Sequence, residues 1–135
     1  MEIDQTAPMT PLETLSHLAG QTEAIDVLWL YGSRARGDAH RGSDYDLAAA
    51  LAGPLSGDDR CRIVEDFEYA ASRALDEPVS CVDINRAPVA LATAVINEGR
   101  VLFCRSYLRL RAEEQRVWSL WEAYKYEHER LREAL

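Results

Sequence analysis

Lysine and long apolar stretches are both scarce in this sequence. Its 135 residues hold 15 Lys and Arg against 23 Asp and Glu, for a formal net charge of −8, and Lys125 is the only lysine. Affinity for nucleic acid comes largely from neutralising phosphates, so this charge balance disfavours a nucleic-acid-binding function. No apolar stretch approaches the length of a membrane span, and the N-terminus lacks a signal-peptide pattern. We therefore expect a cytoplasmic protein with no membrane or nucleic-acid partner.

Cysteine is sparse, and its spacing matches no metal-binding pattern. The three cysteines, Cys61, Cys81 and Cys104, are odd in number and form no C-x-x-C pair. This pattern is typical of reduced thiols and excludes a disulfide framework or a cysteine-based zinc site.

Apolar periodicity predicts alternating helices and strands. We expect helices over 11–20, 58–75, 87–99 and about 107–135, and strands over 24–32, 43–51, 79–84 and 100–104. This order predicts an α/β (α+β) fold with a small mixed sheet of about four strands, flanking helices and a long C-terminal helix. We expect one domain over 1–135, with its core over about 24–105.

Two aspartates stand two residues apart at the start of the second predicted strand. Residues i and i+2 of a strand share a face, so the carboxylates of Asp44 and Asp46 should project together. A shared divalent cation relieves the repulsion between two such anions, and Mg²⁺ takes one or two carboxylates plus substrate phosphates. Asp83 comes late in the third strand. If that strand pairs beside 43–51, three carboxylates would converge, which suits two metal ions.

A Gly-Ser pair directly follows the first predicted strand. Gly32 has no side chain, so backbone there can approach a ligand closely, and we expect Ser33 to cap a short helix that follows. Free amides at a helix start favour phosphate. Arg34 and Arg36 add positive charge nearby, although each could equally be plain surface charge. Phosphate-binding groups that face metal-binding carboxylates together indicate a nucleoside triphosphate site.

The spacing of these residues resembles a known signature. Gly32-Ser33, ten further residues and Asp44-x-Asp46 resemble the G-S-x10-D-x-D pattern of the polymerase-β-type nucleotidyltransferase superfamily. Within it, "GSRARGD", "SDYDLA" and "VDINRAP" resemble the minimal nucleotidyltransferase (MNT) antitoxins that accompany HEPN-domain toxins. The resemblance covers about residues 24–105.

This resemblance implies a polymerase-β-like fold and a specific chemistry. It implies that Asp44, Asp46 and Asp83 are catalytic and bind two Mg²⁺, while Gly32 and Ser33 hold the triphosphate of ATP. The implied reaction transfers AMP to a hydroxyl, with tyrosine the suggested acceptor, of a cognate HEPN toxin RNase. Two alternatives remain open from the sequence: a non-catalytic antitoxin that acts by direct binding, and nucleotidyl transfer to a small molecule such as an aminoglycoside.

Aromatic residues gather on the predicted C-terminal helix. Trp118, Trp121, Tyr124 and Tyr126 could pack on the core of the domain, as amphipathic helices usually do. They could equally form a partner surface, because Trp and Tyr dominate binding hot spots.

Overall fold

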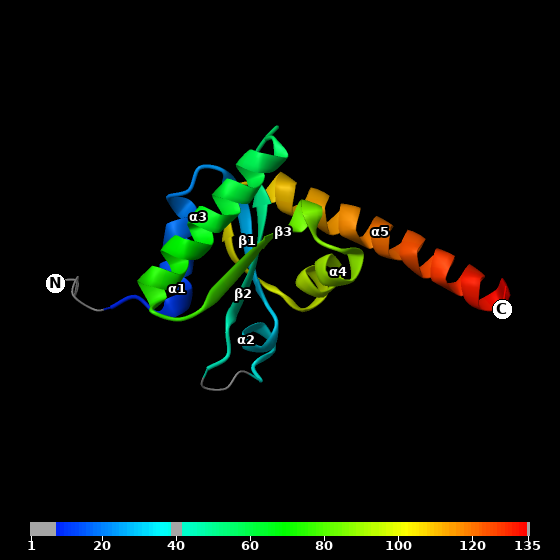
Figure 1. Ribbon diagram of the computed structural model, residues 1–135, viewed down its shortest axis with the longest axis horizontal. Coiled ribbons are helices and arrows are strands. Elements are labelled where there is room, and N and C mark those ends of the chain that lie inside the picture. Colours follow the sequence, from blue (N-terminus) through cyan, green and yellow to red (C-terminus); the bar gives the residue numbers. More distant parts are fainter. Residues whose placement is uncertain (1–7, 39–41, 135) are drawn as a thin grey trace.

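The computed structural model describes residues 8–38 and 42–134 and is shown in Figure 1. The helices are α1 (Pro11–Gly20), α2 (Ser33–Arg36), α3 (Gly57–Leu75), α4 (Val89–Glu98) and α5 (Tyr107–Ala134), with a 3₁₀ turn η1 (Ile84–Arg86). The strands are β1 (Ile25–Tyr31), β2 (Tyr45–Leu51), β3 (Val79–Asp83) and β4 (Arg100–Cys104). The predicted order of helices and strands is confirmed, and only η1 was not anticipated.

The strands form one mixed sheet in the order β3-β2-β1-β4. Strand β1 pairs antiparallel with both β2 and β4, whereas β2 and β3 run parallel. The predicted fold class, a small mixed sheet with flanking helices, is therefore confirmed. The central pair matters for function, because the end of β1 and the start of β2 lie side by side.

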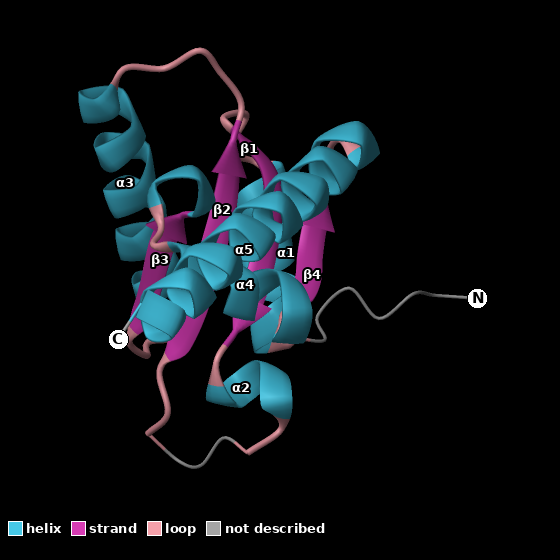
Figure 2. Cartoon of the chain, turned by 90° about the vertical axis from the view of Figure 1, so that its right-hand side faces the viewer, coloured by secondary structure: helices cyan, strands magenta, loops and turns pink. Residues whose placement is uncertain are grey.

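Helices cover both faces of this sheet (Figures 1 and 2). On one face α1 and α3 enclose a core that includes Leu15, Leu47 and Phe67. On the other face α4 and α5 enclose a second core around Trp29 and Val117. Strands β1 and β2 are buried on both faces, which explains why their sequences are nearly continuous apolar runs.

Local signals place the first helix where the sequence predicted it. Thr10 accepts a hydrogen bond from the Glu13 amide at 3.2 Å, and the Glu13 carboxylate accepts one from the Thr10 amide at 3.2 Å. This reciprocal pair satisfies two amides that the helix itself leaves unbonded.

Helix α4 begins two residues later than expected, because Pro88 precedes the helix as its cap residue.

The C-terminal helix has a packed half and a projecting half. Glu113 and Val117 are its buried residues, and beyond them the helix extends away from the body, as Figure 1 shows. Trp118 and Tyr124 are each 44% exposed and Tyr126 is 60% exposed. These three side chains belong to neither core, whereas Trp121 is half-buried. No helix in the described part of the chain combines the length and apolarity needed to cross a bilayer.

A polar network fastens the packed half of α5 to the ends of β1, β2 and β3. Glu113 accepts hydrogen bonds from Asn85 Nδ2 at 2.9 Å, Arg109 Nε at 2.9 Å and Arg116 Nε at 2.8 Å. Arg109 also donates to the Leu51 carbonyl oxygen at 2.7 Å and lies 3.5 Å from Asp26. The network thereby accounts for Asp26, an acidic residue inside an otherwise apolar strand.

The charge of Glu113 is stabilised within this network. Burial by itself would raise the pKa of Glu113, but the hydrogen bonds from Asn85, Arg116 and Arg109 outweigh it, so the pKa lies below its ordinary 4.5. A depressed pKa contributes stability that is fully present above the unfolded-state pKa and is lost as the pH falls through the folded-state pKa.

We predict that Glu113→Gln lowers the free energy of unfolding at pH 7 by about 2 kcal/mol or more, because two arginines lose a buried anion. Acidification from about pH 5 to pH 3 should destabilise the unmodified protein more steeply than this variant. Urea unfolding at several pH values measures both effects. Glu114→Gln is the matched control, since its carboxylate pairs with exposed Arg111 at 3.2 Å and should contribute under about 1 kcal/mol. Equal losses in the two variants would contradict the assignment.

Candidate functional site

A glycine turn joins β1 to α2 directly against the β2 strand. Tyr31, the last residue of β1, pairs with Asp46 of β2. Gly32 follows with a φ of +76°, and a Cβ atom placed there would lie 2.6 Å from Asp46 Oδ2. The positive φ favours glycine, and a Cβ atom at this position would force the Asp46 carboxylate to move. Figure 2 shows α2 next to the start of β2, so the two halves of the signature meet in space.

Ser33 does not play the capping role that the sequence suggested. Gly32 is the N-cap residue of α2, and its carbonyl oxygen accepts hydrogen bonds from the amides of Ala35 and Arg36 at 3.1 Å each. No side chain caps this helix. Ser33 is instead the first helical residue, because the glycine conformation turns the chain one residue earlier than expected.

Asp44 and Asp46 lie where β2 begins. Asp44 is exposed and precedes the strand, while Asp46 is partly buried within it. Their neighbours Tyr45 and Leu47 are buried in the core under α1 and α3, so Asp46 faces the opposite side of the sheet. Among the described residues, no arginine or lysine forms an ion pair with either aspartate. Within the described part of the chain, no cationic side chain therefore neutralises these two carboxylates.

Two residues that sequence reasoning did not single out flank Asp46 in the sheet. Ser80 of β3 is its register partner on one side, and the Ser80 hydroxyl donates to Asp46 Oδ1 at 3.0 Å. Tyr31 is its partner on the other side. Burial raises the pKa of the Tyr31 phenol, and the nearby Asp46 carboxylate and Cys81 raise it further, so Tyr31 remains neutral at physiological pH.

Asp83 does not join this pair of carboxylates, contrary to the sequence-based expectation. Strand β3 does pair with β2, but the register sets Asp83 opposite Ala49, three residues from Asp46 and so about 10 Å along the strand. Val79, Cys81 and Ala49 belong to the core under α1 and α3, so Asp83 faces α3 whereas Asp46 faces the other side. Odd and even strand residues point to opposite faces, which separates Asp83 from Ser80.

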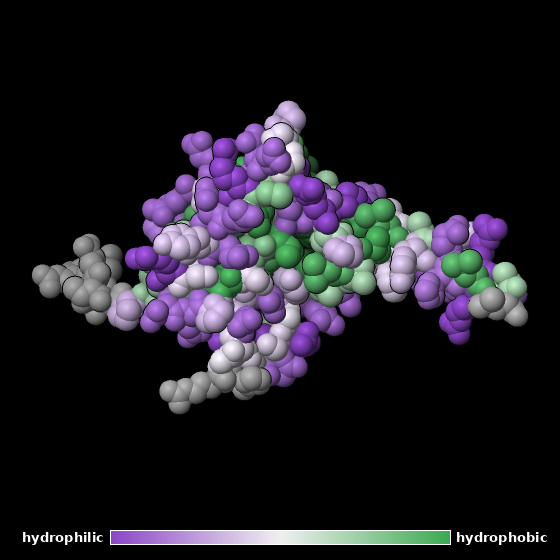
Figure 3. Space-filling view, in the orientation of Figure 1, coloured by the Kyte–Doolittle hydropathy of each residue, from purple (hydrophilic) through white to green (hydrophobic). Residues whose placement is uncertain are grey.

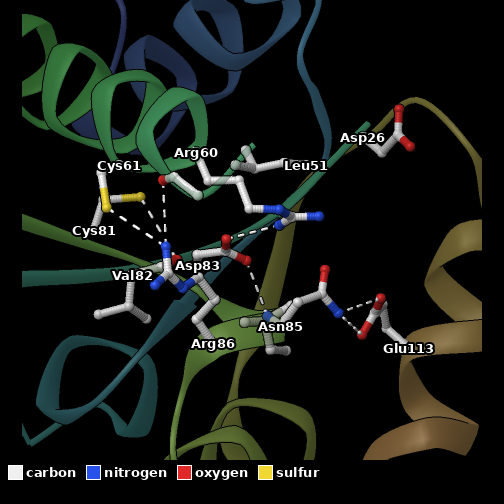
Figure 4. A network of polar contacts seen from close by, with 12 residues as sticks. Asp26, Leu51, Arg60, Cys61, Cys81, Val82, Asp83, Asn85, Arg86 and Glu113 are labelled. Carbon is white, nitrogen blue, oxygen red and sulfur yellow. Dashed lines mark hydrogen bonds and ion pairs between the residues drawn. The ribbon is translucent and has the colours of Figure 1, made fainter. Parts of the chain in front are cut away.

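The surroundings of Asp83 give it a structural role, as Figure 4 shows. Arg60 of α3 donates to Asp83 Oδ2 at 2.7 Å, and the Asn85 amide donates to Asp83 Oδ1 at 3.0 Å. The Asp83 side chain is 7% exposed. A buried carboxylate held by an arginine stabilises the junction of α3, β3 and η1 and is neutralised within the protein.

Within residues 8–38 and 42–134, no three His, Cys, Asp or Glu side chains cluster closely enough to hold a metal ion.

Asp83 lines a groove of about 460 Å³ along the edge of β3, together with Arg60, Cys61 and Arg86. Figure 3 shows apolar surface in this central region, between α3 and α4. Asp44 and Asp46 do not line the groove, so it is separate from the Gly32 turn.

The Arg34 side chain connects α2 to the residues that directly precede β2. Its Nε and Nη2 atoms both donate to the Ser43 carbonyl oxygen, at 2.9 and 2.7 Å. The guanidinium also lies 3.9 Å from the centre of the Tyr45 ring and 3.2 Å from Glu77 Oε2. Contacts on this many sides hold the backbone immediately before Asp44. They favour a positioning role for Arg34 over the phosphate contact suggested from the sequence.

Arg36 is less constrained than Arg34. Its side chain is 46% exposed, and it makes only long contacts, at 3.4 Å to Asp38 and 3.4 Å to Glu98. The hydrogen bond and charge of Asp38, followed by those of Glu98, raise its pKa, so it remains a cation. Of the two arginines, Arg36 has the geometry that can still turn toward an anion.

We predict that Arg34→Lys loosens the start of β2, because lysine cannot donate two hydrogen bonds in a planar fork or stack on Tyr45. Hydrogen–deuterium exchange of a peptide covering Ser43–Leu47 should accelerate about tenfold. Arg36→Lys is the matched control and should leave exchange in that peptide unchanged. The positioning role of Arg34 is refuted if Arg34→Lys exchanges like the unmodified protein, or if both variants accelerate exchange equally.

Comparison with known proteins gives one curated relative. The protein adenylyltransferase MntA of Shewanella oneidensis is 30% identical over 79 residues, which cover 58% of this chain and 54% of that protein. The match thus spans about half the length of the relative.

Solved structures share the fold across nearly the whole chain. A toxin–antitoxin structure with AMP-PNP aligns with a TM-score of 0.72 and 21% identity, covering 93% of this chain and 98% of that one. A complex of tri-AMPylated Shewanella oneidensis HEPN toxin with MNT antitoxin aligns with a TM-score of 0.67 and 18% identity, covering 92% and 94%.

The family comparison is the most direct. The Polymerase beta, Nucleotidyltransferase family matches residues 13–108, a range that contains the Gly32 turn, Asp44, Asp46 and all four strands. Together with the fold and the spacing of the signature, this match confirms the resemblance read from the sequence: the chain belongs to the polymerase β nucleotidyltransferase family.

Proposed function

We propose that this protein is an MNT-type antitoxin that transfers AMP from ATP to a hydroxyl, most simply a tyrosine, of a cognate HEPN toxin. The observation that carries the proposal is the contact between the Gly32 turn and the Asp46 carboxylate, where a Cβ atom would come within 2.6 Å of Oδ2. This contact joins the two halves of the nucleotidyltransferase signature into one site. The curated relative supports the reaction, since it is a protein adenylyltransferase.

The residues around Asp46 fit a divalent cation. Asp44 and Asp46 offer carboxylate oxygens that no described arginine or lysine neutralises, and carboxylate oxygens are the ligands that Mg²⁺ prefers. When bound, Mg²⁺ would neutralise charge on the triphosphate and polarise the reacting phosphorus. Asp83 is left out of this ligand set because it faces α3 and pairs with Arg60.

The proposed reaction is a displacement at the α-phosphorus of ATP. The acceptor hydroxyl oxygen forms a bond to that phosphorus, the bond to the bridging oxygen breaks, and pyrophosphate leaves with that electron pair. The hydroxyl proton passes to solvent or to a carboxylate of the site. In this arrangement the Gly32–Ser33 turn accommodates phosphate oxygens and Arg36 provides positive charge beside them. Arg34 keeps the backbone before Asp44 in place through the Ser43 carbonyl.

The partner is proposed from the relatives and from the shape of the molecule. One solved structure with the same fold pairs an MNT antitoxin with an AMPylated HEPN toxin. In this chain the projecting half of α5, beyond Val117, extends from the body (Figure 1) and exposes Trp118, Tyr124 and Tyr126. Exposed aromatic side chains on a projecting helix suit a protein partner. We propose that this half of α5 contributes to the toxin interface.

The same projecting helix favours a second candidate function, neutralisation by binding alone. A surface that covers the toxin could inhibit it without any chemistry. The two functions differ in whether Asp44 and Asp46 are needed, so one variant separates them.

We predict that the double variant Asp44→Asn, Asp46→Asn loses about a hundredfold or more of the transfer rate, because it can no longer hold the cation that stabilises the transferring phosphoryl group. The measurement is incorporation of label from α-labelled ATP into the cognate HEPN protein, with Mg²⁺ present.

Asp58→Asn is the matched control, since Asp58 is an exposed acid in the first turn of α3 and far from the signature in the sequence. It should transfer label at the normal rate. Undiminished transfer by the double variant would refute the catalytic site. A double variant that transfers nothing yet still neutralises the toxin at equal expression would establish the binding function instead.

A further inference from the structure

Ser80 occupies the place in the sheet where a third carboxylate was expected. Strand β3 runs parallel to β2, and its register sets Ser80, not Asp83, directly beside Asp46. The Ser80 hydroxyl donates a hydrogen bond of 3.0 Å to Asp46 Oδ1. The side chain is partly buried, so water competes only partly for this bond.

The two oxygens of Asp46 face different neighbours. Oδ1 accepts the hydrogen bond from Ser80. Oδ2 lies in the space that a side chain at Gly32 would need, 2.6 Å from the position of a Cβ atom there. The hydrogen bond from Ser80 orients the carboxylate, and carboxylates that bind metal ions are commonly oriented by such a bond.

Asp83 cannot take over this role without a change of register. It lies on the opposite face of β3, and Arg60 Nη1 and the Asn85 amide occupy its two oxygens at 2.7 and 3.0 Å. Bringing Asp83 beside Asp46 would break both interactions and expose the core residues Val79 and Cys81, which share its face.

We propose that Ser80 is a positioning residue of the cation site: its hydroxyl orients Asp46 at the place in the sheet where a third carboxylate was expected. This inference rests on the proposed function, which assigns a divalent cation to those two aspartates. A site with two carboxylates binds a bare cation weakly and depends on phosphate oxygens for the remaining ligands. Metal and nucleotide should therefore bind cooperatively in this protein.

The test is the dissociation constant of Mn²⁺, measured by electron paramagnetic resonance on the full chain, without nucleotide and with AMP-PNP. Ser80→Ala should weaken Mn²⁺ binding about tenfold, because Asp46 loses its orienting bond. Ser80→Thr keeps a hydroxyl on a side chain suited to a strand and should restore binding to near the unmodified value. Ser80→Asp should bind bare Mn²⁺ more tightly than the unmodified protein and reduce its dependence on AMP-PNP.

Asp83→Asn is the control on the other face of the strand. It should lower the temperature of thermal unfolding, since Arg60 loses its buried partner, and leave Mn²⁺ binding unchanged. Far-UV circular dichroism identifies any variant that fails to fold. For Ser80, the threonine and aspartate variants keep the proposal testable if the alanine variant is unstable.

The outcomes separate this inference from the function on which it rests. If the unmodified protein binds Mn²⁺ but Ser80→Ala binds it equally well, Ser80 has no positioning role and the proposed function stands. If Asp83→Asn weakens Mn²⁺ binding more than Ser80→Ala does, Asp83 is the third ligand and the inference is wrong. If the unmodified protein binds no Mn²⁺ even with AMP-PNP, both the cation site and this inference fail.

Discussion

The contact between the last residues of β1 and the first residues of β2 is the constraint on which the site depends. Tyr31 pairs with Asp46, and the next residue, Gly32, turns away with a φ of +76° and leaves the space of its missing side chain to the Asp46 carboxylate. Any side chain at Gly32 would push that carboxylate aside. Antiparallel pairing thus brings the turn and the acidic strand together, although ten residues separate Ser33 from Asp44 in the sequence. Arg34 closes the connection by binding the Ser43 carbonyl oxygen.

The two faces of β3 have different roles: one contributes to the proposed site and the other stabilises the fold. Ser80 faces the side of Asp46 and takes part in the site, while Asp83 faces α3 and forms a buried ion pair with Arg60. Asn85 continues from Asp83 to Glu113, which links this ion pair to the packed half of α5 (Figure 4). A substitution at Asp83 should therefore act through folding, even though its sequence context looks catalytic. The distinction follows from strand alternation.

Local patterns predicted the helices and strands well because each depends on nearby residues. The Thr10 cap, the apolar runs of β1 and β2 and the long final helix were all readable from spacing and composition. Register between strands is not local, and this is why the site was only partly predictable. The motif indicated Gly32, Asp44 and Asp46, but only the pairing of β2 with β3 distinguishes Ser80 from Asp83. The role of Arg34 likewise depends on Glu77 and Tyr45, which the sequence alone does not bring to it.

We propose that the Gly32 turn and the two aspartates at the start of β2 form one site for a metal–nucleotide complex. Anomalous diffraction from crystals grown with Mn²⁺ and AMP-PNP locates the cation most directly. We expect a manganese peak about 2 Å from carboxylate oxygens of Asp44 and Asp46, with phosphate density against the Gly32–Ser33 turn. A manganese peak bound by Asp83, or a nucleotide in the groove along β3 with no cation at Asp46, would contradict it.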